Sequence, residues 1–411
     1  MQKPKKTIAL VEWNWSGHHQ THFNNFTLAL EDLGFDVLGI CPDPILAENL
    51  AKETRPVVKI NKVGGGTTEY IQIGISSNKF RLNRSGRLQT VYWTIKFFKN
   101  IEIQIKEWSN KKQKNVAAIF YCCIYDWEFQ WARFAQPFLS IPWAGLYLQA
   151  RTLRLPGTIN PVTGKIPKPE FMFGGALCKG IAILDEGKCD EASREFRKPV
   201  FVFPEMTDER FQESAEGKLL ADQMIKFANG RIIVGLFGHL SSSKGVEIFL
   251  NAAKESCTSD VCFVMVGEKG WGYEREKNIQ KKISECDNLW FHLNRIFNES
   301  DLNYLISKCH VLFASYIDFP HSSGIMTKAA LFEKPIIVSE GFLMAERVRR
   351  FKLGEVIPQG DHGALLEAIR LITNKRYPWK QNLKPEWDIY RNKNSFECLK
   401  SSFQKMFSNF N

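Results

Sequence analysis

The chain has 411 residues, 44% of them hydrophobic, and a formal net charge of +11. This length is too great for one ordinary core and predicts two domains, and the hydrophobic content is ample for burial. No run approaches the roughly 18 uninterrupted apolar residues of a membrane span. The basic N-terminus leads directly into a strand instead of a signal-peptide core, so we expect a cytoplasmic protein.

Short strands and helices alternate through the first half of the sequence. Strands are predicted at residues 7–13, 36–41, 57–63, 116–124, 142–147, 180–185 and 200–203, and helices at 23–34, 44–54, about 87–110 and 129–138. This alternation is typical of a doubly wound parallel sheet. We expect residues 1–203 to form one Rossmann-like domain.

The second half has the same alternation. Residues 204–230 are polar and helix-prone and are predicted to be a linker. Strands are then predicted at 231–236, 261–267, 288–294, 310–316, 335–339 and 355–358. A second Rossmann-like domain over residues 231–375, followed by a tail of residues 376–411, would place a cleft between the carboxyl ends of the two sets of strands. The predicted fold class is therefore α/β with two doubly wound parallel sheets.

Two loops of the second domain place small residues between a strand and a helix. The first carries Gly238 and Lys244, and the second carries Ser322, Ser323 and Gly324. Small residues let backbone N–H groups approach an anion at a helix N-terminus. The serines could also simply cap the helix, which uses the same backbone donors. Two such loops predict a phosphorylated ligand, with Lys244 as the first candidate to bind its diphosphate.

At these loops the sequence resembles the nucleotide-sugar-dependent glycosyltransferases of the GT-B fold, especially the mostly retaining bacterial family that builds surface polysaccharides. The shared segments are 237–238, 244–245, 264–267, 301–313 and 322–335, and residues 15–23 resemble the loop after that family's first strand. The resemblance implies that two domains face a cleft and that the last helix crosses back to the first domain. It also implies a nucleotide diphosphate sugar as donor and a glycan or lipid-linked acceptor in surface polysaccharide synthesis. Nothing in the residues requires a cofactor, although a divalent ion that bridges the nucleotide diphosphate stays possible.

The sequence departs from that family at three donor positions. The family's Glu-x7-Glu pair falls on Pro320 and Lys328, and its usual arginine in the first loop is His239. The loop lysine is kept as Lys244. Lys328 is either a surface lysine or a contact to the nucleotide. With these substitutions, the resemblance assigns donor contacts to Gly17, Gly238, His239, Lys244, Ser322, Ser323, Gly324 and Lys328.

Candidate catalytic residues follow the first and fourth predicted strands. They are His18, His19 and Asp126, with Glu128 as a further acid. A retaining reaction, which the resemblance favours, needs no strong base. An inverting reaction needs a base to deprotonate the acceptor hydroxyl, and a histidine or carboxylate here could serve. More than one of the histidines at 18, 19 and 22 is expected to be structural or solvent-exposed.

Positive charge is concentrated between Lys79 and Lys114, where ten Lys/Arg residues stand against two glutamates. Six aromatic residues are interleaved with them, so a helix here could show cations on one side and aromatics on another. Such a surface suits the anionic inner face of a membrane, where a lipid-linked acceptor would be found. The alternative is a core-packed helix with a basic solvent face. Nucleic-acid binding is not expected, because no known nucleic-acid module is present.

The ten cysteines are dispersed, with no C-x2-C pair, and the eight histidines lack HExxH spacing. Reduced, buried thiols are expected, and no metal is assigned from side chains.

Two other functions stay open. The altered glutamate positions, Pro320 and Lys328, allow a catalytically inactive nucleotide-binding or scaffold protein. An NAD-dependent Rossmann enzyme is disfavoured, because the first turn lacks G-x-G-x-x-G.

Overall fold

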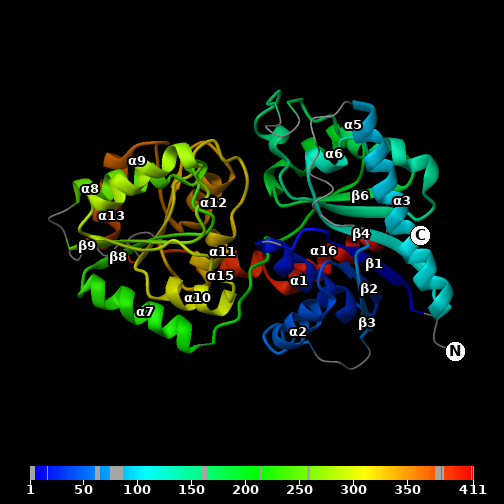
Figure 1. Ribbon diagram of the computed structural model, residues 1–411, viewed down its shortest axis with the longest axis horizontal. Helices are drawn as coiled ribbons and strands as arrows, with labels where there is room; N and C mark the ends of the chain where they lie inside the picture. Colours follow the sequence, from blue (N-terminus) through cyan, green and yellow to red (C-terminus); the bar gives the residue numbers. More distant parts are fainter. Residues whose placement is uncertain are drawn as a thin grey trace. The chain divides into compact units, whose positions relative to one another are not determined.

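The computed structural model describes residues 5–15, 17–60, 65–74, 87–159, 164–212, 214–256, 260–374, 381, 384–408 and 410. The chain divides into two compact units (Figure 1). The first unit comprises Met1–Met206 with Asn394–Asn411, and the second comprises Thr207–Lys393. Each unit is a parallel sheet covered by helices.

The first unit contains a seven-stranded sheet in the order β3-β2-β1-β4-β5-β6-β7. Its strands are β1 (Thr7–Val11), β2 (Asp36–Cys41), β3 (Thr68–Gln72), β4 (Val116–Ile124), β5 (Trp143–Tyr147), β6 (Cys178–Ile183) and β7 (Val200–Val202). All neighbouring strands pair in parallel. The strand order reverses between β1 and β4, which makes their carboxyl ends the switch point of this sheet.

Helices cover both faces of this sheet and create two apolar cores. The helices are α1 (His18–Asp32), α2 (Pro44–Thr54), α3 (Arg87–Lys112), α4 (Asp126–Phe129), α5 (Pro169–Met172), α6 (Cys189–Phe196) and α16 (Phe396–Ser408). The core on one face includes residues of α3 and α6. The core on the other face includes residues of α1, α2 and α16, so the end of the chain is built into the first unit. Phe403 of α16, for example, packs on Phe26, Phe120 and Phe203.

The second unit contains a six-stranded parallel sheet in the order β10-β9-β8-β11-β12-β13. Its strands are β8 (Ile232–Phe237), β9 (Val261–Val266), β10 (Leu289–His292), β11 (Val311–Ala314), β12 (Ile336–Ser339) and β13 (Gly354–Ile357). Its helices are α7 (Ala215–Ala228), α8 (Val246–Glu255), α9 (Tyr273–Ser284), α10 (Glu299–Ser307), α11 (Gly324–Leu331), α12 (Leu343–Phe351), α13 (His362–Thr373) and α15 (Trp387–Lys393). Helices α8, α9 and α13 contribute to one core and the other five to the second.

Both sheets share one topology. In each, the first six strands in chain order have the spatial order 3-2-1-4-5-6, which is that of the Rossmann fold. The predicted class of two doubly wound parallel sheets is confirmed. The strands are rich in buried Val, Ile, Leu and Phe because both of their faces are covered.

The strand predicted at residues 57–63 is wrong over its described part. Residues 55–59 form a turn instead, in which the N–H groups of Val57 and Val58 both bond to the carbonyl of Thr54. Lys59 then takes a left-handed conformation with φ 54°. The edge strand β3 comes later, after the glycines, and residues 61–64 lie outside the described part of the chain.

The segment predicted as a linker contains α7, which belongs to the second unit. Ser214 caps this helix by accepting from the N–H of Gly217 at 3.0 Å. Ala221, Met224 and Ala228 are buried in the core of the second unit. At the other end of the chain, α15 lies in the second unit and α16 in the first, so the tail of residues 376–411 is shared between them.

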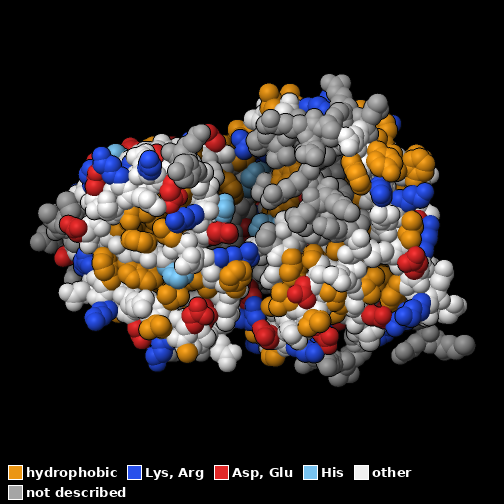
Figure 2. Space-filling model, in the orientation of Figure 1, with side chains coloured by type: hydrophobic (Ala, Val, Ile, Leu, Met, Phe, Trp, Pro, Cys, Tyr) orange, Lys and Arg blue, Asp and Glu red, His pale blue; other side chains and the backbone are white. Residues whose placement is uncertain are grey.

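Helix α3 carries most of the described part of the basic segment. Phe97, Phe98, Ile101 and Ile105 on its inner face are fully buried against the sheet. Basic and hydrophobic side chains lie together along the edge of the first unit where α3 lies (Figure 2), and the basic side chains of this segment that the structure describes are lysines. Three lysines of the segment are paired with acids: Lys106 with Glu102, Lys112 with Glu69 and Lys114 with Asp36. The helix is therefore packed on the core with a basic solvent face. Among the described residues, no helix is long and apolar enough to cross a membrane.

Candidate functional site

Two loops meet at the switch point of the second sheet. One follows β8 and the other follows β11, and these two strands are neighbours. The N–H of Ile317 donates to the carbonyl of Ser243 at 2.9 Å, which ties the loops together. Gly245 has φ 73°, and a Cβ there would lie 2.4 Å from the carbonyl oxygen of Ser315. Glycine is therefore required both by the backbone conformation and by the close approach of the second loop.

Lys244 lies at this junction, at the end of a short 3₁₀ helix formed by Ser242–Lys244. Its ammonium group lies 3.8 Å from the centroid of the Tyr316 ring and 4.6 Å from that of Phe319. The two rings stabilise the cation without neutralising it. No described residue forms an ion pair with Lys244, so its charge is available to an anion.

The second loop ends at the N-terminus of α11. Ser323 is the N-cap residue, but its side chain makes no capping hydrogen bond, and Gly324 is the first helical residue. The neighbouring Ser322 hydroxyl accepts from the guanidinium of Arg347 on α12, a residue only 4% exposed. An uncapped helix N-terminus with a buried arginine beside it is an electropositive position. Sequence reasoning missed Arg347, because only packing distinguishes it from its exposed neighbours Arg349 and Arg350.

The first loop is also shaped by glycines that bring two strands together. Gly238 has φ 115°, and a Cβ at Gly267 would lie 1.7 Å from the carbonyl oxygen of Gly238. The ends of β8 and β9 therefore approach in a way that a side chain would prevent. His239 follows in the loop and is exposed.

Lys328 points away from this junction. Its ammonium donates to Glu299 at 2.8 Å and to Asn303 at 2.5 Å, both on α10. The residue is only 8% exposed. The structure thus brings together Gly238, Lys244, Ser322, Ser323 and Gly324 around two adjoining loops, and it directs Lys328 to the α10–α11 contact.

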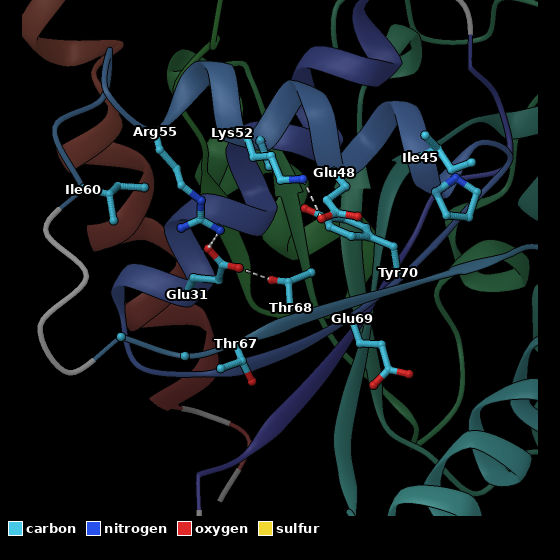
Figure 3. A pocket seen from close by; sticks show the side chains of 14 residues that line it. Glu31, Ile45, Glu48, Lys52, Arg55, Ile60, Thr67, Thr68, Glu69 and Tyr70 are labelled. Atoms are coloured by element: carbon cyan, nitrogen blue, oxygen red, sulfur yellow. Dashed lines mark hydrogen bonds and ion pairs between the residues drawn. The ribbon is translucent and has the colours of Figure 1, made fainter.

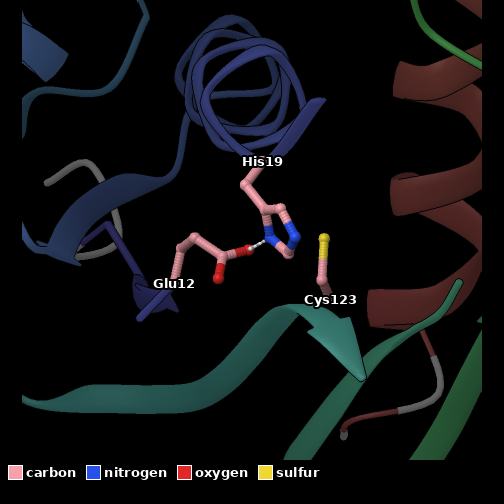
Figure 4. Close-up of side chains that lie close together, drawn as sticks. All are labelled: Glu12, His19 and Cys123. Carbon is pink, nitrogen blue, oxygen red and sulfur yellow. Dashed lines mark ion pairs between the residues drawn. The ribbon is translucent and has the colours of Figure 1, made fainter. Parts of the chain in front are cut away.

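A second group of polar residues gathers at the switch point of the first sheet. Glu12 directly follows β1 and is fully buried. His19 lies in the first turn of α1, with its Nδ1 atom 3.0 Å from Oε2 of Glu12 (Figure 4). The helix begins at His18, five residues earlier than the sequence predicts, after Gly17 with φ 58°. The histidines expected in a loop therefore lie on a helix.

The three histidines have different surroundings. His19 is 4% exposed, and its Nε2 atom lies 3.1 Å from the Tyr125 hydroxyl and 3.1 Å from the Asn14 amide. His22 is buried, which lowers its pKa to about 3 with a smaller contribution from the charge of His19. His18 is exposed, and its ring stacks on that of His19 at 4.9 Å. Of the three histidines, only His18 is exposed.

Two carboxyl groups follow β4 at the same edge. Burial raises the pKa of Glu128 to about 7, and the negative charge of Glu12 also raises it. The indole N–H of Trp13 donates to Glu128 at 3.0 Å, and this hydrogen bond lowers the pKa by a smaller amount than burial raises it. Glu128 is therefore suited to exchange a proton near neutral pH. Asp126 is 7% exposed and accepts a hydrogen bond from the Tyr147 hydroxyl.

Asp126 also lines a pocket of about 400 Å³. Trp131 and Phe171 form an aromatic wall, with ring centroids 6.0 Å apart. The ammonium of Lys165 lies 5.3 Å from the centroid of the Trp131 ring, and Lys168 is a further cation on the rim. Aromatic faces beside carboxylate and amide groups are suited to a sugar ring, which has apolar faces and polar edges.

A larger pocket, of about 700 Å³, lies between α2 and the edge strand β3 (Figure 3). Its charged residues are already paired: Glu31 with Arg55 and Thr68, and Glu48 with Lys52 at 2.8 Å. It lies at the edge of the sheet and not at the switch point. We therefore do not include this pocket in the candidate functional site.

The two doubly wound sheets, each with polar groups at its switch point, define the GT-B class of glycosyltransferase folds. Residues 221–386 match the profile of the family described as glycosyl transferases group 1. The match covers less than half of the chain and lies within the second unit.

Solved structures support the fold over the whole chain. The glycosyltransferase from Rickettsia africae ESF-5 is 14% identical and matches over 99% of both chains, with a TM-score of 0.64. Anabaena Alr3699/HepE, in complex with UDP and glucose, is 13% identical over 98% of this chain and 100% of that chain, with a TM-score of 0.65. Sucrose-phosphate synthase (tll1590) from Thermosynechococcus elongatus is 15% identical over 98% of both chains, with a TM-score of 0.67. No curated protein matches the sequence.

Proposed function

We propose that the protein is a glycosyltransferase that moves a sugar from a nucleotide diphosphate sugar to a glycan or lipid-linked acceptor in surface polysaccharide synthesis. The observation that carries this proposal is the unpaired charge of Lys244 beside the second loop at the switch point of the second sheet. The structure of Anabaena HepE with UDP-glucose gives an example of such a donor on this fold. We infer a donor of the same chemical class here.

The second unit would act on the leaving group. Breaking the anomeric C–O bond develops negative charge on the departing diphosphate. Lys244 and the backbone N–H groups at Ser323 and Gly324 would stabilise that charge, since a helix N-terminus and a fixed cation both favour an anion. Gly238 and His239 would line the same site, and Gly17 would let the backbone of the first unit approach the donor.

The first unit would bind the acceptor. The pocket beside Asp126 offers an aromatic wall for a sugar ring and a carboxylate for its hydroxyl groups. The resemblance favours retention, which needs no strong base. If the reaction inverts, His18 is the exposed histidine able to take the hydroxyl proton, with His19 behind it and Asp126 as the alternative.

We also propose contact with the inner face of a membrane through α3. Tyr92 is 58% exposed, and Lys96 and Lys99 nearby are exposed. An exposed aromatic ring beside cations suits an anionic lipid surface. This contact would bring a lipid-linked acceptor close to the protein.

The test is release of nucleotide diphosphate from a panel of UDP-, GDP- and ADP-sugars by the purified protein. Loss of one electrostatic contact to a developing anion costs roughly 10² to 10³ in rate, so Lys244→Ala should reduce release by that factor. Lys254→Ala is the matched control, since Lys254 lies at the other end of α8 and is paired with Glu285. Equal rates for the two variants would remove Lys244 from the mechanism.

A second candidate function is a nucleotide-binding scaffold without transferase activity. Pro320 and Lys328 stand where the resembling family has its glutamates. The Lys328 ammonium donates its hydrogen bonds to Glu299 and Asn303 on α10. Binding of a nucleotide diphosphate without turnover of any sugar conjugate would establish this alternative. Preferential binding of NAD would instead support a dehydrogenase-like protein.

A further inference from the structure

Three potential metal ligands meet at the switch point of the first sheet. Glu12 follows β1, His19 lies in the first turn of α1, and Cys123 lies near the end of β4 (Figure 4). One ligand atom from each lies within 4.8 Å of the other two. All three residues are buried, with exposed fractions of 0%, 4% and 0%. The side chains are therefore held on three packed elements and already converge.

In the part of the chain that the structure describes, two side-chain atoms of this cluster are paired only with each other. Oε2 of Glu12 and Nδ1 of His19 lie 3.0 Å apart as an ion pair, but neither has a partner with hydrogen-bond geometry among the described residues. Among the described residues, no lysine or arginine forms an ion pair with Glu12. Oε2 of Glu128, which lies in the same group of buried acids, also lacks a partner within the described structure. Buried carboxylates without a fixed cation are costly, so this position favours a positive ion.

We propose that Glu12, His19 and Cys123 bind one divalent transition-metal ion such as zinc. Thiolate, imidazole and carboxylate are the three ligand types that zinc takes in proteins, and the soft sulfur disfavours magnesium and calcium. The thiol of Cys123 gives its proton to solvent as the sulfur–metal bond forms, and neutral His19 binds through the lone pair of one ring nitrogen.

A metal ion at this site would hold neighbouring elements of the first unit in position. An ion at this point would link the carboxyl ends of β1 and β4 to the first turn of α1. It would thereby hold in place the helical turn that carries His18. His19 is then a ligand and His18 remains the solvent-facing histidine. This inference holds whether or not the protein transfers sugars, because it depends only on the first unit.

The first experiment is a cobalt titration of the full chain after dialysis against a chelator. The expected result is saturation at one equivalent, with a thiolate-to-cobalt charge-transfer band and cobalt d–d absorption in the visible range. Added zinc should then abolish both signals. The absence of any cobalt signal in the wild-type protein would overturn the proposal without the need for a variant.

Matched cysteine variants locate the site. Cys122 and Cys123 are adjacent and both fully buried, but only Cys123 belongs to the cluster. Cys123→Ser and His19→Gln should each lower zinc retention and cobalt affinity by at least tenfold, the former with loss of the charge-transfer band. Cys122→Ser should leave both unchanged. A charge-transfer band that persists in Cys123→Ser would show that another cysteine binds the ion and would refute the assignment.

Discussion

Lys244 and Lys328 show how two lysines of one unit acquire different roles. Lys244 is stabilised by two aromatic rings and has no described acidic partner, whereas Lys328 is buried and bonded to Glu299 and Asn303. The sequence indicates Lys244 as a donor contact because it lies in a small-residue loop, and Lys328 because it stands at a donor position of the resembling family. It cannot show which way a lysine side chain turns, since that depends on the acids that other helices present.

We therefore predict a structural effect for Lys328→Ala. Removing the ammonium leaves the partly exposed carboxylate of Glu299 and the buried amide oxygen of Asn303 without this partner, which should lower the free energy of unfolding by about 1 to 3 kcal/mol. Lys281→Ala, which removes an exposed lysine 4.0 Å from Glu285, should change it by less than about 0.5 kcal/mol. Urea unfolding measures both. Unchanged stability with lost nucleotide affinity would instead place Lys328 in the donor site.

The raised pKa of Glu128 should make the free energy of unfolding depend on pH. Its folded-state pKa is raised from 4.5 to about 7, so its contribution to stability is fully present below pH 4.5 and is lost as the pH rises through 7. Glu128→Gln imitates the neutral acid. In buffer with a chelator, it should be more stable than the wild-type protein by about 1 to 3 kcal/mol at pH 8 and nearly equal to it at pH 5.

The control for this experiment is Glu367→Gln, since Glu367 is exposed and paired only at the surface. Its effect should be small at both pH values. An advantage of Glu128→Gln that is the same at pH 5 and pH 8 would show that the carboxyl is ionised throughout this range.

At the scale of elements, the contact between the two donor loops depends on Gly245. Alanine there would need a left-handed backbone and would place its Cβ 2.4 Å from the Ser315 carbonyl oxygen. Gly230 has a similar φ of 78° with nothing within 4 Å of a Cβ, so alanine at Gly230 measures the cost of the left-handed backbone alone, without a steric clash. We expect Gly230→Ala to cost about 1 kcal/mol and Gly245→Ala roughly 1 to 3 kcal/mol more.

Nucleotide affinity distinguishes the two glycines further. Gly245→Ala should weaken nucleotide diphosphate binding because it separates the loops, while Gly230→Ala should not. Thermal unfolding and calorimetry on the same samples give both quantities. Equal effects of the two variants on affinity would show that the loop contact does not shape the site.

The sequence predicts these loops well because strand, small-residue turn and helix follow one another locally. It places the start of α1 too late, because the polar run of residues 18–22 lacks the apolar period that marks a helix. It also misses Arg347, which approaches the second loop from a different helix. The Glu12, His19 and Cys123 cluster escapes spacing rules for the same reason, since its members come from three elements.

At the scale of the molecule, the alternation of strands and helices was enough to predict two doubly wound sheets. The boundaries were not predictable to the same degree. Helix α7 has a polar face like that of a linker, yet its opposite face fills the core of the second unit. The adjacent helices α15 and α16 belong to different units, because each buries its aromatic residues in a different core.

The central claim is that the second unit binds a nucleotide diphosphate at Lys244. Calorimetric titration of UDP, GDP, ADP and NAD into the wild-type protein, Lys244→Ala and Lys254→Ala tests it most directly. We predict micromolar binding of one nucleotide diphosphate, at least a tenfold loss in Lys244→Ala, and no change in Lys254→Ala. Absence of binding by all three nucleotide diphosphates, or equal binding by Lys244→Ala and the wild-type protein, would contradict the claim.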